Sequence, residues 1–188
     1  MTMKSAAFAL GLAVLLTACG GTAERFTVHT PAAPERIGIA FGSVEVRDVS
    51  LPTYAAADEI HVQDATGRLT SSADVLWADA PERAVALELS RNLMQITGRR
   101  IASEPWPFQG FADARLELRF SDLVATTDGR FRASGQYFVA PETGGRDRSG
   151  LFDLAVPFDP EGGPAAIAAA RGQLILQLAQ LIAVEGLR

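Results

Sequence analysis

Residues with reactive side chains are few in this chain of 188 residues, and the sequence does not group them. The two histidines, His29 and His61, have no second histidine or cysteine at the spacing of a zinc site. There is no Gly-x-Ser-x-Gly elbow, no phosphate-binding loop and no dinucleotide fingerprint. The sequence therefore predicts a protein that is not an enzyme and that uses no metal or cofactor. An anchored hydrolase that recruits His61 stays open as the weaker alternative.

Cys19 is the only cysteine of the chain, so a disulfide within the chain has no partner. It follows the apolar run AAFALGLAVLLTA at positions 6–18, which Lys4 precedes. A positive start, an apolar stretch and small residues before a cleavage point are typical of a secretory signal peptide. The run is short for a transmembrane helix, which needs about 20 apolar residues. An uncleaved signal anchor is the alternative.

The junction Leu16-Thr17-Ala18-Cys19 resembles the bacterial lipobox. The resemblance implies that residues 1–18 are removed as a lipoprotein signal peptide and that Cys19 carries covalent lipid. Three acyl chains would hold the protein on a membrane almost permanently, because stable anchoring takes two or more hydrophobic signals. Gly20 stands where an inner-membrane retention signal would have aspartate, which implies the periplasmic face of the outer membrane.

The charge balance excludes nucleic acid as a partner. The formal net charge is -5, and Lys4 is the only lysine. Arginines scattered over an acidic protein do not form the basic footprint that binds phosphate backbones.

The pattern along the chain predicts an acylated cysteine with a flexible tether at 19–35 and a single domain at 36–188, with room for a short first strand at Phe26 and Val28. Alternating or β-rich segments predict strands, with a bend at Gly42-Ser43 and a hairpin turn at Asp128-Gly129. The predicted strands are 37–46, 59–63, 111–120, 130–139 and 151–158.

Two helices are expected. In the first, Asp79 is predicted as the N-cap and Gly98 as the stop. The apolar stripe of this helix is Val85, Leu89, Leu93 and Ile96, and the residues predicted to face away from it are Glu88, Arg91, Asn92 and Gln95. The second helix runs from Pro164 to the end and is apolar on nearly every side, with Arg171 as its only interior charge.

These elements predict an α+β fold, with an antiparallel-rich sheet of about five strands and two helices packed on one face. The apolar surface of the last helix that the sheet does not cover suggests a homo-oligomer as a further hypothesis.

Two apolar segments are candidate partner-binding sites. Pro105-Trp106-Pro107-Phe108 holds two aromatic residues in a proline-fixed stretch, and Leu51-Pro52-Thr53-Tyr54 is expected to be extended and to expose its tyrosine. The candidate contact residues are Leu51, Pro52, Tyr54, Trp106 and Phe108. The alternative for the first segment is that its rings plug one end of the core, and Trp77 is expected to pack the first helix onto the sheet.

The order of these motifs resembles the ABC-transport auxiliary lipoproteins, the family that includes the PqiC-type component. The resemblance rests on VEVRDVSLPTY at 44–54, EIHV at 59–62 and the Trp77-Ala78-Asp79-Ala80-Pro81 segment that opens the first helix. The last differs from the family pattern by Asp for Glu and by one extra residue.

The resemblance implies a non-catalytic accessory or docking component of an MCE-ABC phospholipid transport system that maintains envelope integrity. Its partners would be an MCE-domain protein and an ABC permease system, together with the outer membrane through the lipid on Cys19. An outer-membrane assembly or structural lipoprotein unrelated to lipid transport is the alternative.

Overall fold

The structure is a computed structural model that describes residues 22–29, 31–32 and 35–188. The predicted signal peptide and Cys19 lie outside the described residues. The elements are β1 (Glu24–Phe26), β2 (Ser43–Val46), α2 (Thr53–Ala56), β3 (Val62–Gln63), β4 (Leu69–Thr70), β5 (Val75–Trp77), α3 (Pro81–Thr97), β6 (Arg100–Ser103), β7 (Ala114–Thr126), β8 (Arg130–Pro141), β9 (Arg148–Pro157), η2 (Pro160–Gly162), α4 (Gly163–Leu181) and η3 (Ile182–Gly186).

Three long strands, β7, β8 and β9, form the antiparallel meander that the sequence predicts. In β7 the buried Leu116 and Leu118 alternate with charged neighbours, as expected for a sheet with one covered face. Gly129 has a φ of 77°, so the predicted Asp-Gly turn between β7 and β8 is confirmed.

The other edge of β7 is shared by two short strands. β2 pairs parallel to its start at Ala114–Leu116, and β3 pairs parallel to its end at Ala125–Thr126. β6 and β4 extend the sheet outward from these two, giving seven strands in all, while β1 and β5 form a separate parallel pair. The prediction of an antiparallel-rich sheet of about five strands is therefore wrong in detail, because the sheet is mixed. Strands of two to four residues are too short to show an alternating pattern.

Two predicted strands are shorter than expected. Of the range 37–46 only Ser43–Val46 is strand, and of 59–63 only Val62–Gln63. Two amides in the segment 37–42 bond to the ends of helices instead. The Ile37 amide donates to the Ile96 carbonyl, and the Ala40 amide donates to the Leu187 carbonyl.

The first predicted helix is confirmed as α3, and Gly98 ends it with a φ of 66° and an amide that donates to the Met94 carbonyl. The predicted cap at Asp79 is wrong. The N-cap position is Ala80 without a side-chain cap, and Asp79 accepts a hydrogen bond from the Ala80 amide at 2.9 Å and pairs with Arg83.

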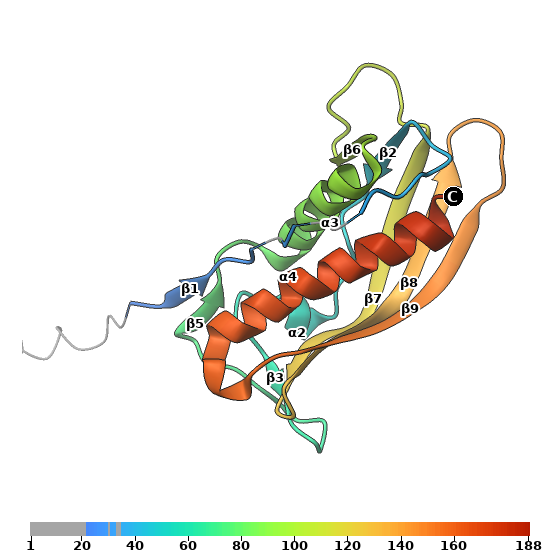
Figure 1. Cartoon of the computed structure of the whole chain (residues 1–188). Helices are drawn as coiled ribbons and strands as arrows, with labels where there is room; N and C mark the ends of the chain where they lie inside the picture. Colours follow the sequence, from blue (N-terminus) through green and yellow to red (C-terminus); the bar gives the residue numbers. More distant parts are fainter. Residues whose placement is uncertain (1–21, 30, 33–34) are drawn as a thin grey trace, which may run out of the picture.

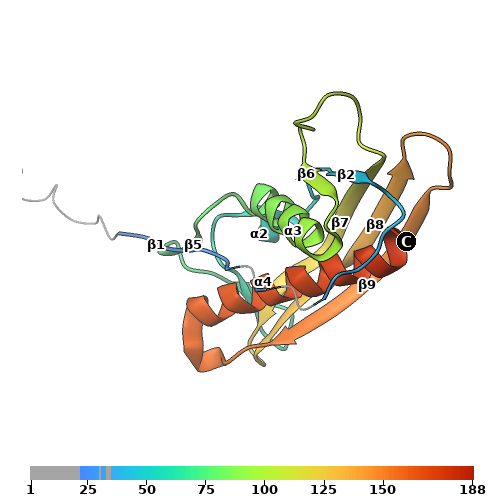
Figure 2. The ribbon, with the colours of Figure 1, turned by 45° about the horizontal axis from the view of Figure 1, so that its top comes forward.

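The two long helices lie side by side on one face of the sheet, as predicted (Figures 1 and 2). α4 therefore covers a second side of α3, and Glu88 and Asn92, predicted to face away from the core, are buried or nearly so. Arg91 and Gln95 are exposed as predicted.

The C-terminal segment Pro160–Gly186 is long and apolar enough to cross a membrane, but 67% of its most apolar window is buried inside the domain. Its core part, α4, packs against α3 and the sheet and continues into the π-helical turn η3. This is the behaviour of a core helix.

Candidate functional site

The predicted contact segment around Tyr54 packs against the core. Thr53–Ala56 form α2, and the Tyr54 hydroxyl donates to Asp122 Oδ1 at 3.2 Å and accepts from the Leu123 amide at 3.4 Å. Burial raises the pKa of the Tyr54 phenol. Leu51 packs against the core and Pro52 is half-buried. The expectation of an extended segment with an exposed tyrosine is therefore wrong.

The second predicted contact segment lies in the loop between β6 and β7. The Trp106 and Phe108 rings pack edge to face with centroids 5.0 Å apart, and the Trp106 amide donates to Glu45 Oε1 at 3.1 Å. Phe108 is exposed, with the Arg100 guanidinium 5.8 Å from its ring centroid. Phe111 is 74% exposed in the same loop. The sequence predicts Phe111 as the start of a strand, but β7 begins only at Ala114.

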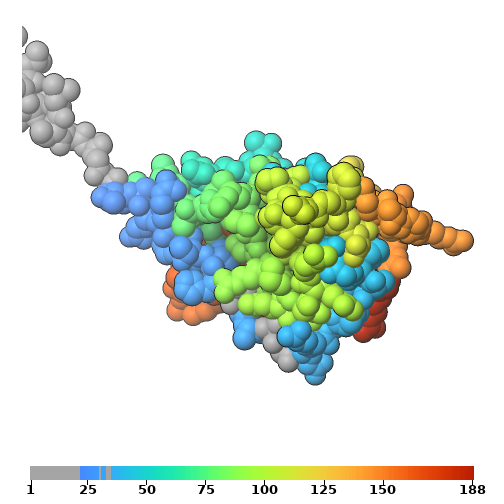
Figure 3. All heavy atoms as spheres, turned by 90° about the horizontal axis from the view of Figure 1, so that it is seen from above, coloured from blue at the N-terminus to red at the C-terminus, as the bar shows by residue number. Residues whose placement is uncertain are grey.

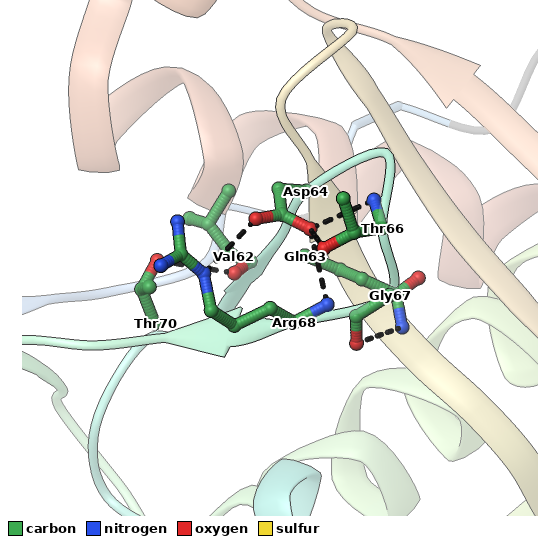
Figure 4. A network of polar contacts seen from close by, with 7 residues as sticks. All are labelled: Val62, Gln63, Asp64, Thr66, Gly67, Arg68 and Thr70. Atoms are coloured by element: carbon green, nitrogen blue, oxygen red, sulfur yellow. Dashed lines mark hydrogen bonds and ion pairs between the residues drawn. The ribbon is translucent and has the colours of Figure 1, made fainter.

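The candidate catalytic histidine and its neighbours have structural roles. His61 Nδ1 lies 3.0 Å from the Glu59 carbonyl oxygen, and the ring packs edge-on against Tyr54. Asp64 closes the β3–β4 turn by accepting hydrogen bonds from Thr66 and Arg68 (Figure 4). The Thr66 hydroxyl is the main cause that lowers the pKa of the Asp64 carboxyl. Both oxygens of Asp64 are thus used in closing the turn.

Within 22–29, 31–32 and 35–188, histidine, cysteine and carboxylate side chains nowhere gather in a group of three that could hold a metal ion.

A buried charged cluster that the sequence does not predict lies between the two helices. Arg171, only 2% exposed, extends from α4 so that its Nη2 lies 3.1 Å from Glu88 Oε1 of α3. Its guanidinium carbon lies 4.6 Å from the ring centroid of Trp77, the last residue of β5. The one signal for this cluster in the sequence is the isolated charge in an otherwise apolar helix.

Burial and pairing act in opposite directions on this cluster. Burial raises the pKa of the Glu88 carboxyl, and the nearby Arg171 opposes that rise. Burial lowers the pKa of Arg171, and Glu88 opposes that change. Because an arginine side chain does not give up its proton in proteins, Arg171 stays charged at neutral pH, and its charge favours the ionised form of Glu88.

A cavity of about 190 Å³ lies beside this pair, bounded by Phe26 and Val28 on one side and by Trp77 and α3 on the other. Glu88 Oε2 and Arg171 Nε have no hydrogen-bond partner among the described residues. The cluster lies where β1, β5, α3 and α4 meet.

The segment that covers the cluster is the N-terminal strap, residues 24–29, which contains β1. Its Phe26 carbonyl accepts from the Ala78 amide at 3.0 Å. Where it crosses α4, a Cβ on Gly172 would lie 2.4 Å from the His29 carbonyl oxygen. Only glycine therefore allows the strap to lie this close to the helix.

A sequence model of the ABC-type transport auxiliary lipoprotein component family matches residues 26–183. The chain belongs to this family. The match begins in the strap of the auxiliary lipoprotein and ends just beyond α4, so it includes the buried cluster and the whole sheet. The resemblance drawn from the short motifs is thereby confirmed.

Solved structures show the same fold at low sequence identity. One uncharacterized protein has a TM-score of 0.69 and 18% identity, over 88% of the auxiliary lipoprotein and 99% of that chain. Protein XCC0632 from Xanthomonas campestris, of the family model DUF330, has a TM-score of 0.67 and 16% identity, over 86% and 93% of the two chains. No curated protein is similar enough in sequence to count as a match.

Proposed function

We propose that this auxiliary lipoprotein is a non-catalytic docking component of an MCE-ABC phospholipid transport system, anchored to the periplasmic face of the outer membrane through lipid on Cys19. The match of the family model to residues 26–183 is the observation that carries the proposal. The outer membrane, the MCE-domain partner and the lipid cargo are the parts that go beyond the family itself.

The described chemistry supports a docking role. His61, the candidate catalytic residue of the hydrolase alternative, is engaged in local packing, and the buried Glu88–Arg171 pair connects α3 to α4. The exposed rings of Phe108 and Phe111 give the domain an apolar contact surface, of the kind that aromatic residues form at protein and membrane interfaces.

Affinity purification of the full-length lipoprotein from detergent-solubilised envelopes tests this proposal. We expect an MCE-domain protein to co-purify, together with its permease, at a fixed stoichiometry that mass spectrometry can quantify. The control is Cys19→Ala, which leaves the folded domain intact but removes the lipidation site. A lipidated protein that brings down no MCE-domain protein would contradict the proposal, and intact-mass analysis of the same preparation shows whether the lipid is present.

A further inference from the structure

The exposed side of α3 alternates basic and apolar residues. Arg83, Leu87, Arg91 and Met94 are three or four residues apart, so they share one side of the helix. All four are exposed, and Met94 is 48% exposed. A core helix of a self-contained domain normally presents charged or polar residues to water at such positions.

The basic character increases toward the end of α3. Residues 89–103 contain three arginines, Arg91, Arg99 and Arg100, and no acidic residue. The Arg36 guanidinium adds a further positive charge here, because it lies against Gly98. Acidic residues also lie near this side, with Asp79 and Glu82 at the start of α3 and Glu35 next to Arg36, and Asp79 is already paired with Arg83.

Aromatic rings continue the same surface. The β6–β7 loop places the exposed Phe108 beside Arg100, and Phe111 follows. We call this surface the α3 face and define it by its members: Arg83, Leu87, Arg91, Met94, Arg99, Arg100, Phe108 and Phe111. Figure 3 shows α3, the β6–β7 loop and the N-terminal strap side by side on one side of the molecule.

The position of the strap connects this face to the anchor. Thr22, the first described residue, is three residues after Cys19, a distance of at most about 11 Å along an extended chain. A lipid on Cys19 would therefore hold the strap close to the membrane surface, and the α3 face adjoins the strap.

From this geometry we propose that the α3 face lies on the surface of an anionic lipid membrane, the one into which Cys19 is anchored. Arginines would contact lipid phosphates, while Leu87, Met94 and Phe108 enter the boundary between head groups and acyl chains. The inference rests on the lipid anchor of the proposed function and adds an orientation: the opposite, charged face of the sheet points into the periplasm.

A spin label at position 94 of the full-length lipidated protein tests the orientation. Lipidation consumes the Cys19 thiol, so Met94→Cys introduces the only free thiol. The matched site is Leu151→Cys, because Leu151 is 73% exposed on β9 and its neighbour Phe152 points into the core. Both are reconstituted into vesicles of phosphatidylcholine with phosphatidylglycerol, and collision with a water-soluble nickel complex and with oxygen is measured by electron paramagnetic resonance.

We expect the label at position 94 to be protected from nickel and accessible to oxygen, and the label at 151 to show the reverse. The triple variant Arg91→Glu, Arg99→Glu, Arg100→Glu should abolish the protection, since each arginine strengthens contact with an anionic surface about fivefold. Its control, Arg130→Glu, Arg132→Glu, Arg146→Glu, makes the same change of net charge elsewhere on the exposed surface and should keep the protection.

Equal nickel accessibility at positions 94 and 151 would overturn the proposal. So would protection at 94 that occurs only when a partner protein is added, because the α3 face would then be a protein interface. The triple-glutamate variant should still co-purify its transport partner. Loss of partner and lipid from the wild-type protein would instead be a failure of the proposed function.

Discussion

At the scale of single residues, the most consequential feature is a charge buried in the apolar helix α4. Arg171 satisfies part of its hydrogen-bonding capacity with Glu88 and packs its flat guanidinium against Trp77. Such a pair contributes little net stability, but removing one partner leaves the other charge buried and alone.

Glu88→Gln should therefore lower the free energy of unfolding by about 3–5 kcal/mol, measured by urea denaturation at neutral pH. The double variant Glu88→Leu, Arg171→Met should recover most of that loss, because apolar side chains replace both charges. Glu117→Gln is the matched control, since it breaks the exposed pair with Arg119 and should cost no more than about 1 kcal/mol. A Glu88→Gln protein as stable as the wild type would contradict this prediction and would show that water reaches the Glu88–Arg171 pair.

The residues that the sequence misjudged share a physical cause. Period-3.6 patterns assume one buried side, so Glu88 and Asn92 were placed outward although α4 covers that side. The burial of Tyr54 cannot be read from nearby residues, because its hydrogen-bond partner Asp122 lies 68 residues away in the sequence. The sequence left open whether Trp106 and Phe108 plug the core or face outward, and in the structure Trp106 is half-buried while Phe108 is exposed.

At the scale of elements, long periodic segments were predictable and short ones were not. α3 and the β7–β8 hairpin carry enough repeats of their period to be recognised, together with Gly98 and Gly129 at their ends. The mixed sheet was not predictable, because it depends on two short strands, β2 and β3, that pair with the start and the end of the same edge of β7. That arrangement is decided by tertiary packing.

The element most open to a local test is the N-terminal strap. Gly172→Ala would put a Cβ 2.4 Å from the His29 carbonyl oxygen, so the strap must move off α4. We expect a loss of about 1–3 kcal/mol in stability. Hydrogen exchange should accelerate at the amides of Glu24 and Ala78, which bond to Asp74 and Phe26.

The matched control is Gly38→Ala, where a Cβ would meet no atom within 4 Å. That variant should leave both the stability and the exchange rates unchanged. Wild-type exchange at Ala78 in the Gly172→Ala protein would mean that the helix shifts instead of the strap.

At the scale of the whole molecule, the proposed orientation depends on how little chain separates the anchor from the domain. A flexible linker of about 20 Gly and Ser residues inserted after Gly21 would span roughly 25 Å on average. The α3 face would then lose most of its effective concentration at the membrane.

We expect this insertion to raise nickel accessibility at position 94 several-fold in the same vesicles, with lipidation and thermal stability unchanged. The same linker inserted between Gly144 and Gly145, in the exposed β8–β9 loop, leaves the anchor connection as it is and should have no effect. If the label at position 94 stays protected from nickel with the long linker, the α3 face binds lipid without help from a short connection to the anchor.

The strap also determines how the domain responds to mechanical tension. The chain enters the fold through β1, whose three residues pair only with β5, whereas the sheet behind them is held by much longer ladders. A force applied through the lipid anchor would therefore separate β1 from β5 first, one residue pair after another. Trp77 and the Glu88–Arg171 pair would then be exposed to solvent while α3, α4 and strands β7 to β9 remain folded.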